Sequence, residues 1–287
     1  MSEPGPFGPP PQSPNPFQAS QVAPATPPIA PTGSFQFEYM RAYNYIFENP
    51  NWLMNVVWWS VCILVGGFIP IVPYLVIVGH MFEIVESLYI TKGTRYPDFD
   101  PNRFAEYLGR GIWPFLVALI VVLPLVVVSY IGIVAVAFGA MAAGAVGGDD
   151  LGPVLAVMVF VLGMFAFVAF MLIISMLVTP LYLRAGLMQD FGGAFDFAWA
   201  MDFVKKTWVE MILAFLFIQF SGIVIMLVGL MALCIGIYPA NAIMLLAQTY
   251  IVYQLYVLYL SRGGTPIPLK PRMPMPQPGF APPPQQY

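Results

Sequence analysis

Three ionisable residues with helical spacing form the candidate site in this sequence. His80, Glu83 and Glu86 follow one another at intervals of three within a largely apolar stretch, so on a helix their side chains project from neighbouring positions. A charge inside the hydrocarbon of a bilayer is costly, which makes such a group a functional candidate for proton relay, cation coordination or a polar path between helices. The alternative is structural, with Glu86 at the cytosolic interface and His80 hydrogen-bonded to another span. Both interpretations are compatible with the sequence.

The rest of the sequence offers no catalytic or metal-binding motif. A single histidine excludes two-histidine metal motifs, and neither a GxSxG nor a Walker-type loop is present. Cys62 and Cys234 both lie in apolar runs and are expected to be small buried hydrophobic residues. We therefore expect no enzyme activity, no metal and no cofactor. Nucleic acid is not an expected partner either, because the sequence lacks a basic run interleaved with aromatic residues.

Other polar residues have a structural interpretation. Asp98 and Asp100 suggest a carboxylate pair, but turn and capping roles are favoured, with Asp100 capping a helix that opens at Pro101. Amides at membrane depth are expected to join helices through hydrogen bonds. These amides are Asn55, Gln219, Gln248 and Gln254, with Asn241 nearer the external end.

The composition requires a bilayer as solvent. Apolar residues make up 59% of the chain and charged residues 9%, and the mean hydropathy is +0.79. The sequence predicts an all-α polytopic membrane helix bundle with six transmembrane helices arranged as three hairpins. The third and fourth spans are each roughly 30 or more residues long, where about 20 would cross the hydrocarbon, so they must tilt, kink or protrude. The expected spans are about 51–68, 74–89, 113–148, 154–180, 211–233 and 240–260, with turns at 69–73, 149–153 and 237–239.

Interfacial helices and charge set the expected orientation. The aromatic-rich segments 35–47, 103–110 and 195–206 each precede a hairpin and a tryptophan, a pattern typical of amphipathic helices in the headgroup plane. All eleven Lys and Arg residues fall on one side of the six predicted spans. The positive-inside rule then places both termini in the cytosol, for a multi-pass protein of the cell (cytoplasmic) membrane.

Both ends of the chain are rich in proline. Residues 1–34 hold eleven prolines and residues 263–287 hold nine, so we expect disordered cytosolic tails flanking a membrane domain at 35–262. Proline-rich segments are already extended and are ligands for proline-binding protein modules. A solubilising linker is the alternative for both tails.

The chain resembles a bacterial and archaeal family of membrane proteins, the domain of unknown function numbered 4013. The resemblance covers roughly residues 40–260 and implies a polytopic membrane domain without an assigned activity. It rests on Gly79, Gly93, Tyr96 to Asp100, Phe104 to Gly111, Pro180, Arg184 and Ala194 to Asp196.

We expect a non-enzymatic role in membrane organisation or in scaffolding partners through the tails. The alternative is a transporter or channel component that uses His80, Glu83 and Glu86 as a polar path. A lipid-handling membrane enzyme is a third and weaker hypothesis. The expected partners are the lipid bilayer and proline-binding modules, and the sequence does not specify an oligomeric state.

Overall fold

The computed structural model describes residues 35–232 and 235–270, which form helices and connecting segments without a strand. This confirms the predicted all-α class. The predicted tail 1–34, most of the predicted tail 263–287, and Cys234 lie outside the described residues. The elements in chain order are α1 (Arg41–Glu48), α2 (Trp52–Gly66), α3 (Ile71–Ile90), the short 3₁₀ helix η1 (Pro101–Arg103), α4 (Phe104–Val146), α5 (Gly148–Met188), α6 (Phe191–Ala194), α7 (Phe197–Met231) and α8 (Ile237–Ser261).

Six segments of the described chain are long and apolar enough to cross a membrane, as predicted for a polytopic bundle. These six segments differ from the six predicted spans in one place. The first predicted span forms α2, which has 15 residues and reaches only about 22 Å, because the helix ends at Gly66 ahead of Pro70. In its place α4, with 43 residues, supplies two of the six segments, 101–121 and 123–146.

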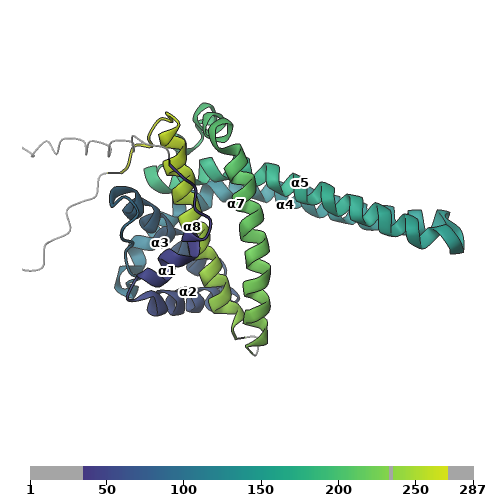
Figure 1. Cartoon of the computed structure of the whole chain (residues 1–287), viewed down its shortest axis with the longest axis horizontal. Coiled ribbons are helices and arrows are strands. Elements are labelled where there is room, and N and C mark those ends of the chain that lie inside the picture. Colours follow the sequence, from purple (N-terminus) through teal and green to yellow (C-terminus); the bar gives the residue numbers. More distant parts are fainter. Residues whose placement is uncertain (1–34, 233–234, 271–287) are drawn as a thin grey trace, which may run out of the picture. The chain divides into compact units, whose positions relative to one another are not determined.

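Helices α4 and α5 form a long antiparallel hairpin that extends to one side of the other helices (Figure 1). At 43 residues α4 is about 64 Å long, so the predicted excess length is present as continuous helix. The predicted turn at 149–153 is wrong, because Asp150 and Pro153 already belong to α5. The chain turns at Gly147 and Gly148 instead, and Gly148 has φ +64°, a conformation that costs glycine little.

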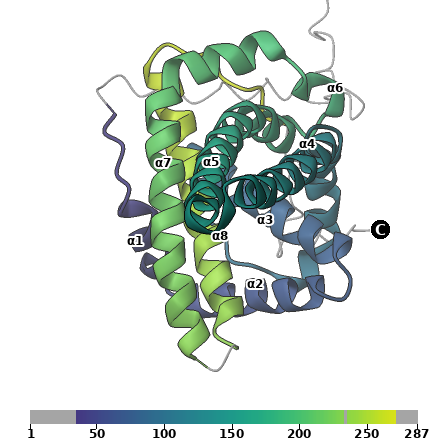
Figure 2. The same cartoon turned by 90° about the vertical axis from the view of Figure 1, so that its right-hand side faces the viewer.

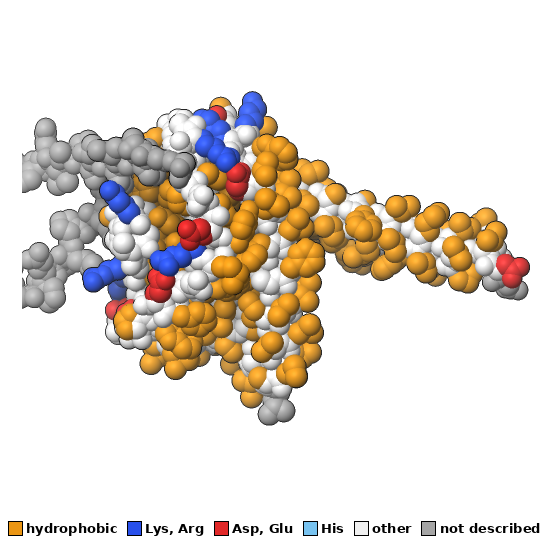
Figure 3. Space-filling view, in the orientation of Figure 1, with side chains coloured by type: hydrophobic (Ala, Val, Ile, Leu, Met, Phe, Trp, Pro, Cys, Tyr) orange, Lys and Arg blue, Asp and Glu red, His pale blue; other side chains and the backbone are white. Residues whose placement is uncertain are grey.

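The apolar helices differ in what surrounds them. In the most apolar windows of α3 and α8, 72% and 78% of residues are buried inside the protein, whereas the corresponding values are 6% for 123–146 and 0% in α5. In the most apolar window of α7, 17% of residues are buried, so α7 is nearly as exposed as the hairpin. Consequently α3 and α8 form an enclosed core, and α4, α5 and α7 present apolar side chains to their surroundings (Figure 3).

Glycines bring α3 and α4 into backbone contact. A Cβ built on Gly79 would collide with the carbonyl oxygen of Tyr107, and one built on Gly111 would collide with that of Leu75. The two helices therefore run antiparallel at the closest possible approach, which is typical of small residues at membrane helix interfaces. This contact sets the register of the charged residues described below.

The predicted interfacial segments join larger helices. Segment 103–110 spans the end of η1 and the start of α4, and the first turns of α7 run at a steep angle to the rest of that helix (Figure 2). In α1 the apolar face lies against α8, where the hydroxyl of Tyr45 donates to the carbonyl oxygen of Leu246 at 2.6 Å. Helix α1 is thus amphipathic as predicted, but its apolar face is covered by protein.

Candidate functional site

The cluster on α3 lies in the enclosed core and meets the beginning of α4. His80 is fully buried, and Glu83 and Glu86 are 7% and 4% exposed. The antiparallel contact between the two helices places the cations Arg103 and Arg110 opposite the two carboxylates. Both carboxylates therefore have a cationic partner within the protein.

His80 is held by hydrogen bonds at both ring nitrogens. The indole Nε1 of Trp59 on α2 donates to Nδ1 at 3.0 Å, and Nε2 lies 3.2 Å from the carbonyl oxygen of Pro97. Because a carbonyl only accepts, Nε2 carries the proton and Nδ1 does not. The rings of Phe99 and Tyr107 each lie 5.2 Å from the imidazole. This environment fixes a neutral tautomer that joins α2, α3 and the loop before η1.

Glu83 pairs with a cation that η1 positions. Its carboxylate lies 2.9 Å from Nη1 of Arg103, and the same guanidinium lies 2.8 Å from the carboxylate of Glu106. The guanidinium also sits 5.4 Å from the centre of the Tyr107 ring. Asp100 begins η1 by accepting a hydrogen bond from the backbone nitrogen of Asn102 at 2.9 Å, which confirms its predicted capping role.

Glu86 forms the most buried ion pair recorded among the described residues. Its carboxylate contacts Arg110, and the two side chains are 5% and 11% exposed. Arg110 also donates to the carbonyl oxygen of Phe82 at 2.9 Å. Each of the two buried carboxylates, Glu83 and Glu86, is thus paired with an arginine at the α3–α4 contact, as buried charges require.

Asp98 is a hydrogen-bond acceptor for three amides at the start of α2. Asn49, Asn51 and Asn55 donate to its carboxylate at 2.9, 2.7 and 3.1 Å, and Asn55 accepts from the backbone nitrogen of Phe99 at 2.8 Å. Burial alone would raise the pKa of Asp98, but these hydrogen bonds lower it below its ordinary value. Asp98 therefore ties the loop to α2, which is a different role from the predicted turn or cap.

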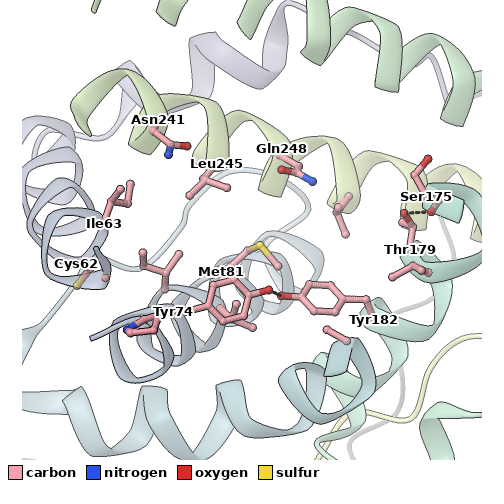
Figure 4. Close-up of a pocket in the computed structure, with 17 residues that line it drawn as sticks. Cys62, Ile63, Tyr74, Met81, Ser175, Thr179, Tyr182, Asn241, Leu245 and Gln248 are labelled. Carbon is pink, nitrogen blue, oxygen red and sulfur yellow. Dashed lines mark hydrogen bonds between the residues drawn. The ribbon is translucent and has the colours of Figure 1, made fainter. Parts of the chain in front are cut away.

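A cavity of about 520 Å³ lies on another side of α3, among α2, α3, α4, α5 and α8 (Figure 4). From α3 it is lined by Tyr74, Ile77, Val78 and Met81, and Cys62 lines it from α2. His80, Glu83 and Glu86 are not among the residues that line it. The structure thus separates the charged cluster from the cavity.

The predicted amides divide into two groups. Gln254 exchanges two hydrogen bonds with the backbone of Glu38, at 2.8 and 2.9 Å, so it joins elements as Asn55 does. For Gln219, Gln248 and Asn241 no hydrogen bond to another described residue is recorded. Sequence reasoning missed the partners Arg103 and Arg110, although their spacing of seven residues, two helical turns, places them on one face of a helix.

A family described as a protein of unknown function (DUF4013) has a model that matches residues 62–235. This match covers more than half of the chain and confirms the resemblance based on the 96–100 and 104–111 motifs. No curated protein and no solved structure matches the chain.

Proposed function

Because the chain belongs to DUF4013, a family of proteins of unknown function, we propose from its own contacts that it is a non-enzymatic membrane scaffold. In this role the apolar helices hold the protein in the bilayer. The two proline-rich tails recruit proteins that carry proline-binding modules. The cluster on α3 serves to assemble the membrane domain.

The observation that supports this proposal is that the two ends of the described chain are fixed to one turn of α8. On the N-terminal side, the backbone of Glu38 is held by Gln254. On the C-terminal side, the backbone nitrogen of Ile267 donates to the hydroxyl of Tyr256 at 2.8 Å, and the Ile267 side chain is buried. The described chain continues to Lys270. The two attachment points, Gln254 and Tyr256, are therefore two residues apart on α8.

Charge distribution supports a cytosolic location for both attachment points. Lys and Arg side chains gather on the side of the described unit away from the tip of the α4–α5 hairpin, where an acidic side chain lies (Figure 3). With the positive-inside rule, the basic side faces the cytosol. The tails then emerge where soluble modules can reach them.

The transporter alternative has less support from the geometry. A polar path needs groups that exchange partners with water or an ion. Both ring nitrogens of His80 are occupied, Glu83 and Glu86 pair with arginines, and none of the three lines the cavity. These contacts favour a structural role for the cluster.

A binding assay tests the scaffold proposal. The full chain in lipid nanodiscs is titrated with purified SH3, WW and EVH1 domains, each as a single and as a tandem module. We expect micromolar binding of at least one module, and tighter binding of its tandem form because two tails are presented together. Deleting residues 1–34 or 271–287 should abolish the gain from the tandem form. Absence of binding by every module would refute recruitment through the tails.

Flux assays test the alternative on the same protein. Proteoliposomes are loaded with a pH-sensitive dye, and proton leakage is compared for the wild type, Glu83→Gln and empty vesicles. The scaffold proposal expects all three rates to agree. A wild-type rate above that of empty vesicles that Glu83→Gln removes would instead establish a polar path.

A further inference from the structure

The cavity beside α3 has the composition of a binding site for an uncharged lipid. Its walls come from α2, α3, α4, α5 and α8, and all of these except α2 contain candidate membrane spans. A molecule reaches such a site from the bilayer more readily than from water. A volume of about 520 Å³ falls within the range of about 300–1,000 Å³ that is usual for small-molecule sites.

Two amides on α8 face this cavity without a partner in the described chain. Asn241 and Gln248 are seven residues apart, two helical turns, and therefore lie on one face. Figure 4 shows both side chains directed toward the cavity, with Leu245 between them. Asn241 is half-buried and Gln248 is exposed, and an amide that faces hydrocarbon without a hydrogen bond is costly. Each of these two amides offers two N–H donors and a carbonyl acceptor to an occupant.

Hydroxyl groups complete the polar part of the lining. Ser175 and Thr179 on α5 donate to carbonyl oxygens of their own helix at 2.8 and 2.6 Å, so their oxygens remain available as acceptors. The hydroxyls of Tyr74 and Tyr182 lie 3.4 Å apart. A hydrogen bond between two hydroxyls uses only one of their two protons, so the other proton can be donated to a bound molecule. The cavity thus presents both donors and acceptors.

The absence of charge among the residues that line the cavity decides the ligand class. The residues that line the cavity include neither a cation that would match a phosphate or carboxylate nor an anion that would match an ammonium group. Aliphatic and sulfur-containing side chains such as Ile77, Met81 and Val252 form the rest of the wall. We propose that this cavity binds the uncharged, hydroxyl- and ester-bearing headgroup of a neutral membrane lipid of the diacylglycerol class, with Asn241 and Gln248 as its main hydrogen-bonding residues. The proposal is independent of the tails and of the scaffold function.

Glycine positions supply a steric test with a matched control. Gly66 lines the cavity, and a Cβ built there meets nothing within 4 Å, so Gly66→Leu would occupy space without a backbone clash. Gly109 on α4 is also open within 4 Å and does not line the cavity. Gly109→Leu is therefore the control for adding a leucine side chain to a helix.

The experiment uses the full chain in nanodiscs with a photoreactive diacylglycerol that carries a diazirine on one acyl chain. We expect saturable labelling that unlabelled diacylglycerol competes and that maps to residues 62–66 or 241–252. Gly66→Leu should reduce the labelling at least about tenfold, and Gly109→Leu should leave it unchanged. In the double variant Asn241→Leu/Gln248→Leu, the concentration of unlabelled diacylglycerol needed for half-maximal competition should rise about 30-fold. This is the change expected for the loss of two neutral hydrogen bonds.

Three results would overturn the proposal. Labelling that persists in Gly66→Leu would mean that the probe binds elsewhere. Labelling spread along α4 and α5 without saturation would mean bulk lipid contact only. Equal labelling by a photoreactive phosphatidic acid would contradict an uncharged site. Size-exclusion profiles and helical circular dichroism of each variant identify any loss of signal that comes from misfolding.

Discussion

Gly79 and Tyr107 touch through their backbones, so α3 and α4 meet at a point where α3 has no room for a side chain. Along η1 and α4 this contact lies between Arg103, which pairs with Glu83, and Gly111, which contacts Leu75. Close approach is what lets short-range hydrogen bonds and ion pairs form between the two helices. The charged cluster and the glycine contact are therefore parts of one interface.

The glycine contact predicts a large effect of one added methyl group. Gly79→Ala should destabilise the protein by about 3 kcal/mol, because the Cβ collides with the backbone of Tyr107 and not with a movable side chain. Gly109→Ala, at an open helical position, should be neutral or stabilising by up to about 1 kcal/mol. Thermal unfolding in detergent, followed by size-exclusion fluorescence, compares the two. Equal melting temperatures would contradict the close approach.

The buried ion pair predicts a non-additive mutation cycle. Replacing only Arg110 with Met leaves the Glu86 carboxylate buried without this partner, which should cost about 3–5 kcal/mol. Replacing Glu86 with Gln in the same protein should recover most of that loss, because the second charge is then removed as well. Urea unfolding of the wild type, both single variants and the double variant measures the coupling. Strict additivity would show that the two groups do not interact.

The hydrogen bonds of His80 predict an effect of its indole partner. Trp59→Phe keeps an aromatic ring but removes the donor to Nδ1, which should cost about 1–3 kcal/mol because a buried acceptor is left unpaired. Trp58→Phe, at a neighbouring and less buried position, serves as the matched control. Near-ultraviolet circular dichroism during thermal unfolding measures the loss of stability in each of the two variants. A smaller effect of Trp59→Phe than of Trp58→Phe would contradict this role.

Asp98 predicts a pH dependence of stability. A carboxyl whose pKa is lower in the folded protein than in the unfolded chain stabilises the fold above its unfolded pKa, about 3.9. That contribution is lost as the pH falls through the lower folded-state pKa. We therefore expect the stability advantage of the wild type over Asp98→Asn to shrink below about pH 4 and to be complete above about pH 5. Asn51→Ala removes one donor to Asp98, which should raise the pKa of its carboxyl. The loss of stability on acidification should then occur at higher pH. Unfolding midpoints measured between pH 3 and 7 test both statements.

The attachment of the chain ends predicts reciprocal changes in hydrogen exchange. Gln254→Leu removes both bonds to Glu38, so amide exchange in residues 35–40 should increase while Ile267 stays protected. Tyr256→Phe removes the acceptor of the Ile267 amide and should show the opposite pattern. Exchange followed by mass spectrometry resolves the two peptides. Increased exchange at both ends in either variant would mean that the two attachments are not independent.

The sequence was sufficient for the all-α membrane class because apolar runs and prolines act locally. It also identified Asp100 as a cap from its place before Pro101. It did not predict that α3 would be enclosed and α5 exposed, because both are apolar enough to cross a membrane and their surroundings depend on tertiary packing. Nor did it predict the partners of Glu83 and Glu86, since the choice of Arg103 and Arg110 depends on the register that Gly79 and Gly111 set.

The two attachments on α8 also determine how the protein bears mechanical load. Glu38 and Ile267 are fastened to Gln254 and Tyr256, so tension applied between the N-terminal and C-terminal segments is carried by one turn of a single helix. That helix is the most enclosed of the candidate spans, and the α4–α5 hairpin lies outside the path of the force. Two proteins pulling on opposite ends of this chain would therefore be linked through its most enclosed candidate span.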